Sequence, residues 1–152
     1  MRRQPGFTLI ELITVIIILG ILSAFVLPRF GGLEAHARAA SLEGLAGSVR
    51  SGAALAHSLW LAEGNEPAAV TMAGVSIAMD TTTGYPEELN TGIKEVISSL
   101  DGFDFAPIGG VSPGYRFGII GATDTTNCKV TYLLGTTAGA PPTVTVAGSA
   151  CE

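Results

Sequence analysis

The chain has few charged residues for its length, and it also has few aromatic residues. Charged side chains make up 14% of its 152 residues, aromatic ones 7%, and hydrophobic ones 47%. A chain this apolar is not disordered, and the low charge indicates that partners cover part of its surface. The net charge is −5 and the basic residues cluster only at Arg2 and Arg3. The electrostatic footprint of a nucleic-acid-binding protein is therefore missing, and we expect no nucleic-acid partner.

The side chains that enzymes and metal sites need are also scarce. His36 and His57 lie in a stretch with helical periodicity, about 31 Å apart along a helix axis. The "MDTTTG" at residues 79–84 lacks the lysine and the glycine spacing of a P-loop. Asp101 and Asp104 have no third group beside them. We therefore expect no enzyme, no cofactor and no metal, with a membrane-anchored periplasmic hydrolase or binding domain as a distant alternative.

Cysteine occurs only twice, at Cys128 and Cys151. Two thiols without nearby histidines are too few for a tetrahedral zinc site. In a chain with an export-like start, the pair favours one disulfide in an oxidising compartment, and two free buried thiols are the alternative. A bond closing a loop of this size would stabilise the fold by about 3–4 kcal/mol through the entropy of the unfolded chain.

One apolar run dominates the N-terminal region. Residues 7–27 carry a single charge, Glu11, and would form a helix about 30 Å long, enough to cross a bilayer. Arg2 and Arg3 precede the run, so the N-terminus should stay cytoplasmic and the rest of the chain should lie outside. A carboxylate in hydrocarbon costs about 2.5–3.5 kcal/mol on insertion scales, so its presence suggests a task. Pro28 predicts a kink because it removes one helical hydrogen bond.

The helical pattern continues beyond the proline to about residue 62, with Gly64 as its C-cap. Apolar residues recur there at spacings of three and four, which predicts one buried face against a globular head. The residues of this face are Leu42, Leu45, Val49, Ala53, Ala56 and Trp60. Arg38, Glu43 and Arg50 are predicted on the opposite side.

After residue 67 the pattern changes to strands and turns. Alternating apolar residues around "AG" at residues 73–74 predict a short hairpin, and residues 91–100 read as a short helix. Strands are predicted at residues 115–122, 128–135 and 142–148, joined as an antiparallel meander. The fold class is therefore α+β, with a long kinked N-terminal helix packed against a small antiparallel sheet.

The first 30 residues resemble the type IV pilin and pseudopilin family. The basic leader "MRRQPG" is followed by "FTLIELITVIIILGILSAFVLP", which has phenylalanine first, glutamate four residues later and then an unbroken apolar helix. The resemblance implies the pilin fold and four segments along the chain. They are a leader peptide at residues 1–6, a transmembrane and filament-core helix at 7–29, the outer half of the long helix at 30–64, and a β head with a C-terminal disulfide loop at 65–152.

The resemblance also implies roles for individual residues. In the family, a prepilin peptidase cleaves after the glycine that corresponds to Gly6 and methylates the new amine, here that of Phe7. Glu11 matches the glutamate that pairs with the N-terminal amine of a neighbouring subunit during assembly. Gly20 and Pro28 match the positions between which the helix often unwinds in assembled filaments.

The function implied is that of a structural subunit of a bacterial type IV pilus, which serves adhesion, surface attachment or motility. Its partners would be identical subunits in a helical homopolymer, the prepilin peptidase and the inner-membrane assembly platform. The prepilin would lie in the inner membrane, and the assembled subunit in an extracellular fibre at the cell surface.

Two features leave the type of fibre and the processing open. The "GYP" at residues 84–86 and the C-terminal cysteine pair resemble the mannose-sensitive haemagglutinin pilins, a type IVa-like group. The alternative is the major pseudopilin of type II secretion, whose head usually has a calcium loop, but Asp124 and Glu152 are too sparse for one. Rival readings of the apolar run are a plain signal anchor and a secretory signal cleaved before Phe25.

Overall fold

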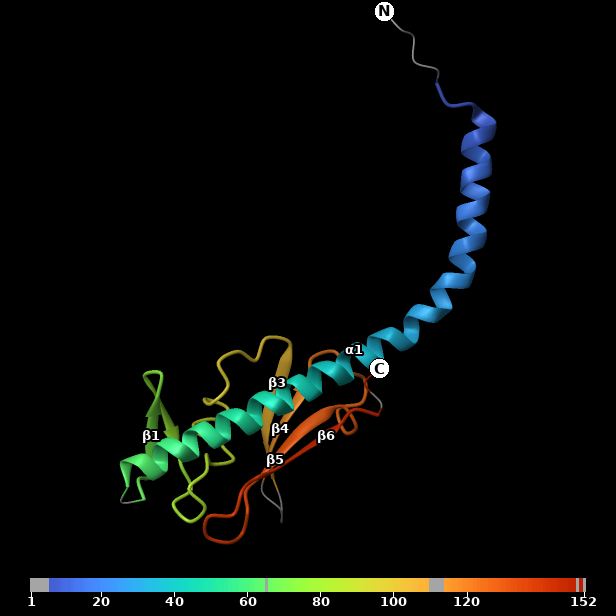
Figure 1. The fold of residues 1–152 in the computed structure, drawn as a ribbon. Helices are drawn as coiled ribbons and strands as arrows, with labels where there is room; N and C mark the ends of the chain where they lie inside the picture. Colours follow the sequence, from blue (N-terminus) through green and yellow to red (C-terminus); the bar gives the residue numbers. More distant parts are fainter. Residues whose placement is uncertain (1–5, 65, 110–113, 150, 152) are drawn as a thin grey trace, which may run out of the picture.

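The computed structural model describes residues 6–64, 66–109, 114–149 and 151, without the side chains of residues 27–31. It consists of one long helix and two antiparallel sheets, which confirms the predicted α+β class. Figure 1 shows both sheets beside the second half of the helix, while the first half extends away from them. The elements are α1 (Leu9–Glu63), β1 (Ala69–Met72), β2 (Val75–Ala78), β3 (Phe103–Ile108), β4 (Gly114–Ile119), β5 (Lys129–Leu133) and β6 (Thr143–Ala147).

Helix α1 has a defined cap at each end. The side chain of Thr8, the N-cap, accepts a hydrogen bond from the backbone N–H of Glu11. At the other end Gly64 has a φ of 66°, a value that suits glycine, and its N–H donates to the Trp60 carbonyl at 3.3 Å. The Trp60 indole donates in turn to the Pro67 carbonyl at 2.9 Å, which fixes the chain reversal after the helix. The predicted helix end and cap are confirmed.

The helix runs through Pro28 without a break in its assignment. It curves along its length, so that its first half turns away from the head (Figure 1). A helix can continue across a proline because only one backbone hydrogen bond is lost, provided that good helix formers flank the proline on both sides.

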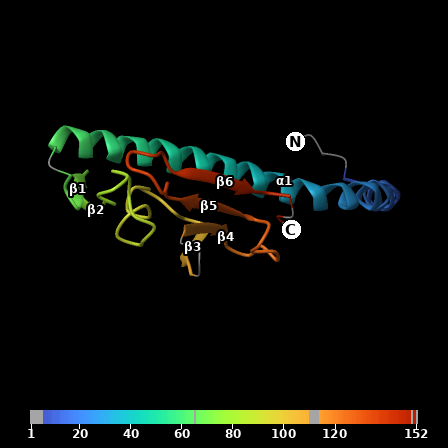
Figure 2. The same cartoon turned by 90° about the horizontal axis from the view of Figure 1, so that it is seen from below.

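The head is built on one face of the second half of α1. Figure 2 shows the helix lying along β6 and β5, with β3 and β4 farther from it. The buried residues of the helix are Leu42, Leu45, Ala46, Val49, Ala53 and Ala56. They pack with the buried side chains of the larger sheet, namely Tyr115, Phe117, Val130 and Tyr132. The predicted apolar face is therefore confirmed, with Trp60 partly buried at its end.

The larger sheet has four strands in the order β3-β4-β5-β6, all antiparallel to their neighbours. The last three are the predicted meander, with shorter bounds than expected. The sequence analysis missed β3, an edge strand that contains Pro107, a residue that sheets tolerate mainly at their edges. On the outer face of the sheet, Asp104 in β3 pairs with Arg116 in β4 at 3.0 Å. The predicted hairpin is also present, as β1 and β2.

The predicted short helix at residues 91–100 is wrong, because this segment forms successive turns. Its backbone hydrogen bonds span three residues, from the N–H of Gly92 to the Leu89 carbonyl and from that of Glu95 to the Gly92 carbonyl, both at 3.1 Å. A short segment can satisfy its polar backbone in this way without the costly nucleation of an α-helix. Ile93 is still fully buried, so the apolar spacing that predicted a helix arises instead from packing against the core.

Two tyrosines of the larger sheet hold this turn region in place. The hydroxyl of Tyr132 donates to the Pro86 carbonyl at 2.8 Å, and that of Tyr115 donates to the Asn90 side chain. Burial, helped by the negative charge of Glu88, raises the pKa of the Tyr132 phenol far above its usual range. Burial also raises the pKa of Tyr115. Both phenols therefore keep their protons to a higher pH than exposed tyrosines do, and they are neutral donors at neutral pH.

We predict that Tyr132→Phe destabilises the head by about 1 kcal/mol at pH 7, the usual net value of one hydrogen bond. The native pKa is raised, so the stabilising contribution of Tyr132 is complete below the unfolded pKa near 10 and declines as the pH rises above it, by about 1.4 kcal/mol per pH unit. Urea unfolding of the full chain in detergent, at pH 7 and pH 11, should show that the difference in the free energy of unfolding between wild type and variant becomes smaller at the higher pH. A gap that is constant with pH would contradict the buried, neutral phenol.

Candidate functional site

The first half of α1 is uncovered. None of the 18 residues Leu9–Val26 is buried, and the leucines, isoleucines and valines among them are 46–75% exposed. By length and composition this segment could cross a membrane, a test that signal sequences also pass. Fully burying one such side chain is worth about 1.5–3 kcal/mol, so a surface of this size must be covered by lipid or by other protein chains.

The polar end of this surface is a capping box formed by Thr8 and Glu11. The carboxylate oxygen Oε2 of Glu11 accepts hydrogen bonds from the Thr8 backbone N–H at 2.9 Å and from the Thr8 hydroxyl at 2.8 Å. The Thr8 hydroxyl accepts the Glu11 backbone N–H at 3.3 Å. This reciprocal arrangement satisfies donors that the start of a helix leaves free, and it places a negative charge at the positive end of the helix dipole.

The capping box changes the interpretation of Glu11. From the sequence, its carboxylate had no partner within its own span, whereas the structure provides two donors on Thr8. The signal was available, because threonine followed three residues later by glutamate is the capping-box pattern. The second carboxylate oxygen, Oε1, accepts no hydrogen bond from any described residue. The carboxylate can therefore take an additional cationic partner without giving up the cap.

The other residues predicted for this region are accessible where they are described. Phe7 is 91% exposed, and a side chain built on Gly6 or Gly20 would meet open space. Gly20 lies within the unbroken α1, so unwinding near it stays a prediction for assembled chains. Leader residues 1–5 and the side chain of Pro28 lie outside the described part of the chain.

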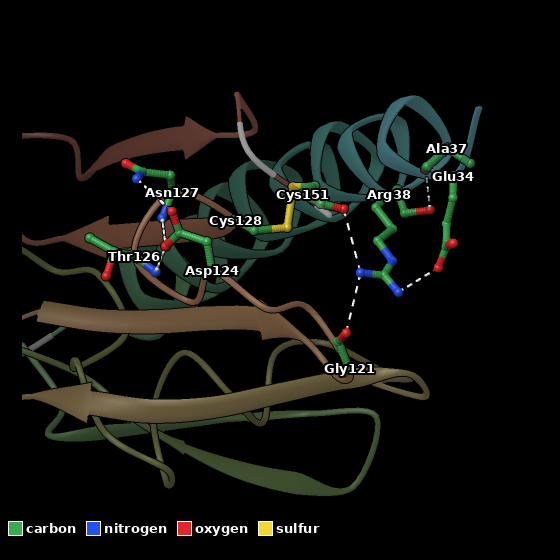
Figure 3. The surroundings of a disulfide bond; sticks show 10 residues. Glu34, Ala37, Arg38, Gly121, Asp124, Thr126, Asn127, Cys128 and Cys151 are labelled. Carbon is green, nitrogen blue, oxygen red and sulfur yellow. Dashed lines mark hydrogen bonds and ion pairs between the residues drawn. A yellow bond between two sulfur atoms is a disulfide. The ribbon is translucent and has the colours of Figure 1, made fainter. Parts of the chain in front are cut away.

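A second feature is the disulfide between Cys128 and Cys151, which lies close to Arg38 of α1 (Figure 3). Cys128 directly precedes β5, and Cys151 follows β6. The bond therefore ties the segment after β6 to the start of β5, and both of these strands contact α1. Both cysteines are buried.

Two arginine side chains on α1 donate hydrogen bonds to backbone carbonyls of the head and so hold the head against the helix. Nη1 of Arg38 donates to the carbonyls of Gly121 at 3.3 Å and Cys151 at 3.4 Å, and Nη2 pairs with Glu34 (Figure 3). Nη2 of Arg50 donates to the Val144 carbonyl in β6 at 3.0 Å. The prediction that both arginines point away from the head is therefore wrong, because long side chains reach the head from the edge of the buried face.

The loop before Cys128 is organised by Asp124. Its carboxylate accepts the backbone N–H groups of Thr126 at 2.8 Å and Asn127 at 3.0 Å, and the Asn127 side-chain amide at 2.8 Å (Figure 3). The side-chain and backbone hydrogen bonds from Asn127, with that from Thr126, lower the pKa of Asp124. All three donors come from the loop itself, so Asp124 shapes the turn into β5.

Apart from His36, which is exposed, the residues weighed for catalysis are occupied by packing or by local hydrogen bonds. The His57 ring stacks on Tyr85 with centroids 4.1 Å apart, and its Nδ1 lies 2.7 Å from the Gly84 carbonyl. Asp80 accepts hydrogen bonds from Thr83 in the "MDTTTG" segment, which is a turn as expected. Within the described ranges, no group of three or more histidine, cysteine, aspartate or glutamate side chains could hold a metal.

Two comparisons with known proteins give matches, each to a part of the chain. The sequence model of the family described as "Prokaryotic N-terminal methylation motif" matches residues 1–27. A curated relative, the type IV narrow pilus major component PilA5 of Thermus thermophilus, is 50% identical over 54 residues. That match covers 36% of this chain and 47% of the Thermus protein, so the chain aligns with about half of its relative. No solved structure matches the chain.

We predict that Thr8→Val opens the first turn of α1, because the shape of the side chain is kept while its hydroxyl is lost. Losing an N-cap of this kind typically costs about 1 kcal/mol. Hydrogen exchange of the first-turn amides, Glu11 and Leu12 among them, should be about fivefold faster in detergent micelles. Thr14→Val is the matched control, because the Thr14 hydroxyl bonds only to the Ile10 carbonyl within the helix. Equal exchange in both variants would contradict the capping role.

Proposed function

We propose that the chain is a type IV pilin, the structural subunit of a type IV pilus fibre, as the N-terminal methylation motif and the similarity to a pilus component support. The observation that carries the proposal is the uncovered half of α1, an apolar helix with no buried residue and a single carboxylate at its start. Lipid covers this surface before assembly, and identical helices of neighbouring subunits cover it in the fibre. The same segment is therefore both the membrane anchor and the polymerisation surface.

Processing creates the cation that Glu11 can use. A prepilin peptidase cleaves between Gly6 and Phe7 and methylates the Phe7 amine, which then lies at the start of the helix. The amine of one subunit pairs with the Glu11 carboxylate of another, at the oxygen that Thr8 leaves unused. A charge buried in apolar surroundings is destabilising unless it meets a partner of opposite charge. Subunits therefore assemble only in the register that places the amine of one beside Glu11 of another.

The surrounding machinery follows from this role. Arg2 and Arg3 keep the N-terminus of the precursor cytoplasmic, and the inner-membrane assembly platform moves processed subunits into an extracellular fibre. A pilus fits better than a type II secretion pseudopilus, because the end of the head is closed by a disulfide in place of a calcium loop, and PilA5 is named as a pilus component. The mannose-sensitive haemagglutinin subtype, and a role in adhesion or motility, stay predictions.

We predict that subunits in sheared surface fibres begin at Phe7 with a methylated amine. Intact-mass spectrometry of the purified fibre measures this directly. A start at Phe25, as after a secretory signal peptidase, differs by 18 residues and is easily resolved. A subunit that retains Met1 or begins at Phe25 would overturn the proposed function.

We also predict that the charge of Glu11 is needed for assembly and that its capping role alone is insufficient. Glu11→Gln keeps an acceptor for the capping box but removes the charge, while Glu11→Ala removes both. Both variants should insert into the membrane, Glu11→Ala more favourably by about 2–3 kcal/mol, yet neither should yield fibres. Fibre yield is compared by shearing and immunoblotting at equal membrane pools, with Glu11→Asp expected to be intermediate. Normal fibres from Glu11→Gln would show that Glu11 acts only as a cap.

A further inference from the structure

The two edges of the larger sheet are covered to different extents. β6 lies along α1, and its Val144 carbonyl accepts the hydrogen bond from Arg50 (Figure 2). β3, at the other edge, lies farther from the helix, and its residues Phe105 and Pro107 are exposed. An uncovered edge strand is a template on which a strand of another chain can pair. The backbone groups of β3 therefore decide whether heads can associate at this edge.

The register of β3 with β4 determines which of these backbone groups point outward. Opposite residues of an antiparallel ladder alternate between pairs that exchange backbone hydrogen bonds and pairs that do not. The Ile120 N–H donates to the Gly102 carbonyl at 3.0 Å, one position before the first pair of the ladder. Every second residue of β3 after Gly102 therefore bonds to β4. The residues whose backbone groups point away from β4 are Phe103, Phe105 and Pro107.

Only one of these three positions offers a free N–H donor. The N–H of Phe103 is used within the chain, on the Leu100 carbonyl at 3.0 Å. Pro107 has no N–H, and its ring occupies the space that a partner strand would need. The N–H of Phe105 has no backbone partner among the described residues, but the Lys94 amine lies 5.0 Å from the centroid of the Phe105 ring. Proline and lysine are residues that natural sheets place at edges to prevent pairing.

We propose that Pro107 closes the β3 edge against strand pairing, so that two heads cannot join into one continuous sheet. In a head-to-head pair with a twofold axis at Phe105, Pro107 of each chain would lie opposite Phe103 of the other. Each of these two positions would lack a hydrogen bond and would meet a proline ring. The inference goes beyond the proposed function and does not depend on it, since it concerns the folded head. Chains then associate through other surfaces, such as the uncovered half of α1.

Hydrogen exchange of the wild-type chain in detergent micelles tests the geometry of the edge. After correction for intrinsic rates, the Phe105 amide should exchange about tenfold faster than the Asp104 and Ala106 amides, because those two are bonded to β4. Equal protection at the three positions would overturn the inference, since the Phe105 N–H would then be bonded as well.

Replacing the proline tests the closure itself. Pro107→Val restores an outward N–H, so sedimentation equilibrium in density-matched detergent should show self-association at least about fivefold tighter than that of wild type. Pro141→Val is the matched control, because Pro141 is exposed but lies outside the strands, and this variant should associate as wild type does. Adding Phe105→Pro to the Pro107→Val chain removes the remaining outward donor and should restore the wild-type association.

Equal association of Pro107→Val and Pro141→Val would overturn the inference, as would tighter association that Phe105→Pro does not reverse. Circular dichroism checks that each variant is folded, and Pro107→Thr takes the place of Pro107→Val if the valine variant does not fold. Failure of the wild-type chain to form fibres would overturn the proposed function and would leave this inference unaffected.

Discussion

The structure depends on how one helix divides its surface between two environments. The second half of α1 supplies Leu42, Val49 and their neighbours to the core, and both sheets pack against that half. The first half is more apolar, with Glu11 as its single charge between Leu9 and Val26, yet none of these residues is buried. The head can thus fold around half of a helix, while the apolar surface of the other half stays uncovered. In the proposed fibre, folding and assembly would use different parts of the same element.

The charge at the start of α1 fits the same division. An isolated carboxylate at that position would be costly in an apolar environment, but Thr8 offers it two hydrogen bonds and the helix dipole favours it there. The free-energy cost of placing this carboxylate in apolar surroundings is therefore lower than the sequence alone suggests. The second carboxylate oxygen, Oε1, accepts no hydrogen bond from a described residue and could still bind a cationic partner.

The sequence predicted the features that follow from periodicity and missed those that depend on contacts between distant segments. The end of α1 at Gly64, the buried helix face and the order of the last three strands all came from local patterns. Strand β3 escaped because Pro107 and a charged residue weaken its pattern, although an edge strand tolerates both. The segment at 91–100 was misread because Ile93 and Val96 have helical spacing, whereas their burial arises from packing against the core.

At the candidate site, too, the sequence predicted the residues of local motifs and missed the contacts between distant segments. The leader, Phe7 and Glu11 were recognisable because they form a contiguous motif. The Thr8 cap could also have been read from the sequence, since both of its residues lie within one turn. The contacts of Arg38 with Gly121 and Cys151 could not, because they join residues more than 80 positions apart and depend on the tertiary fold.

The two ends of the head offer unequal room for added sequence. Cys151 is buried, and its carbonyl accepts a hydrogen bond from Arg38 of α1. The β1–β2 turn lies at the opposite end, and its residues Ala73 and Gly74 are exposed in a tight turn that little else touches. An epitope, an affinity tag or a displayed peptide therefore belongs in this turn, because sequence added after Cys151 would start from a buried, disulfide-bonded residue that contacts Arg38 of α1.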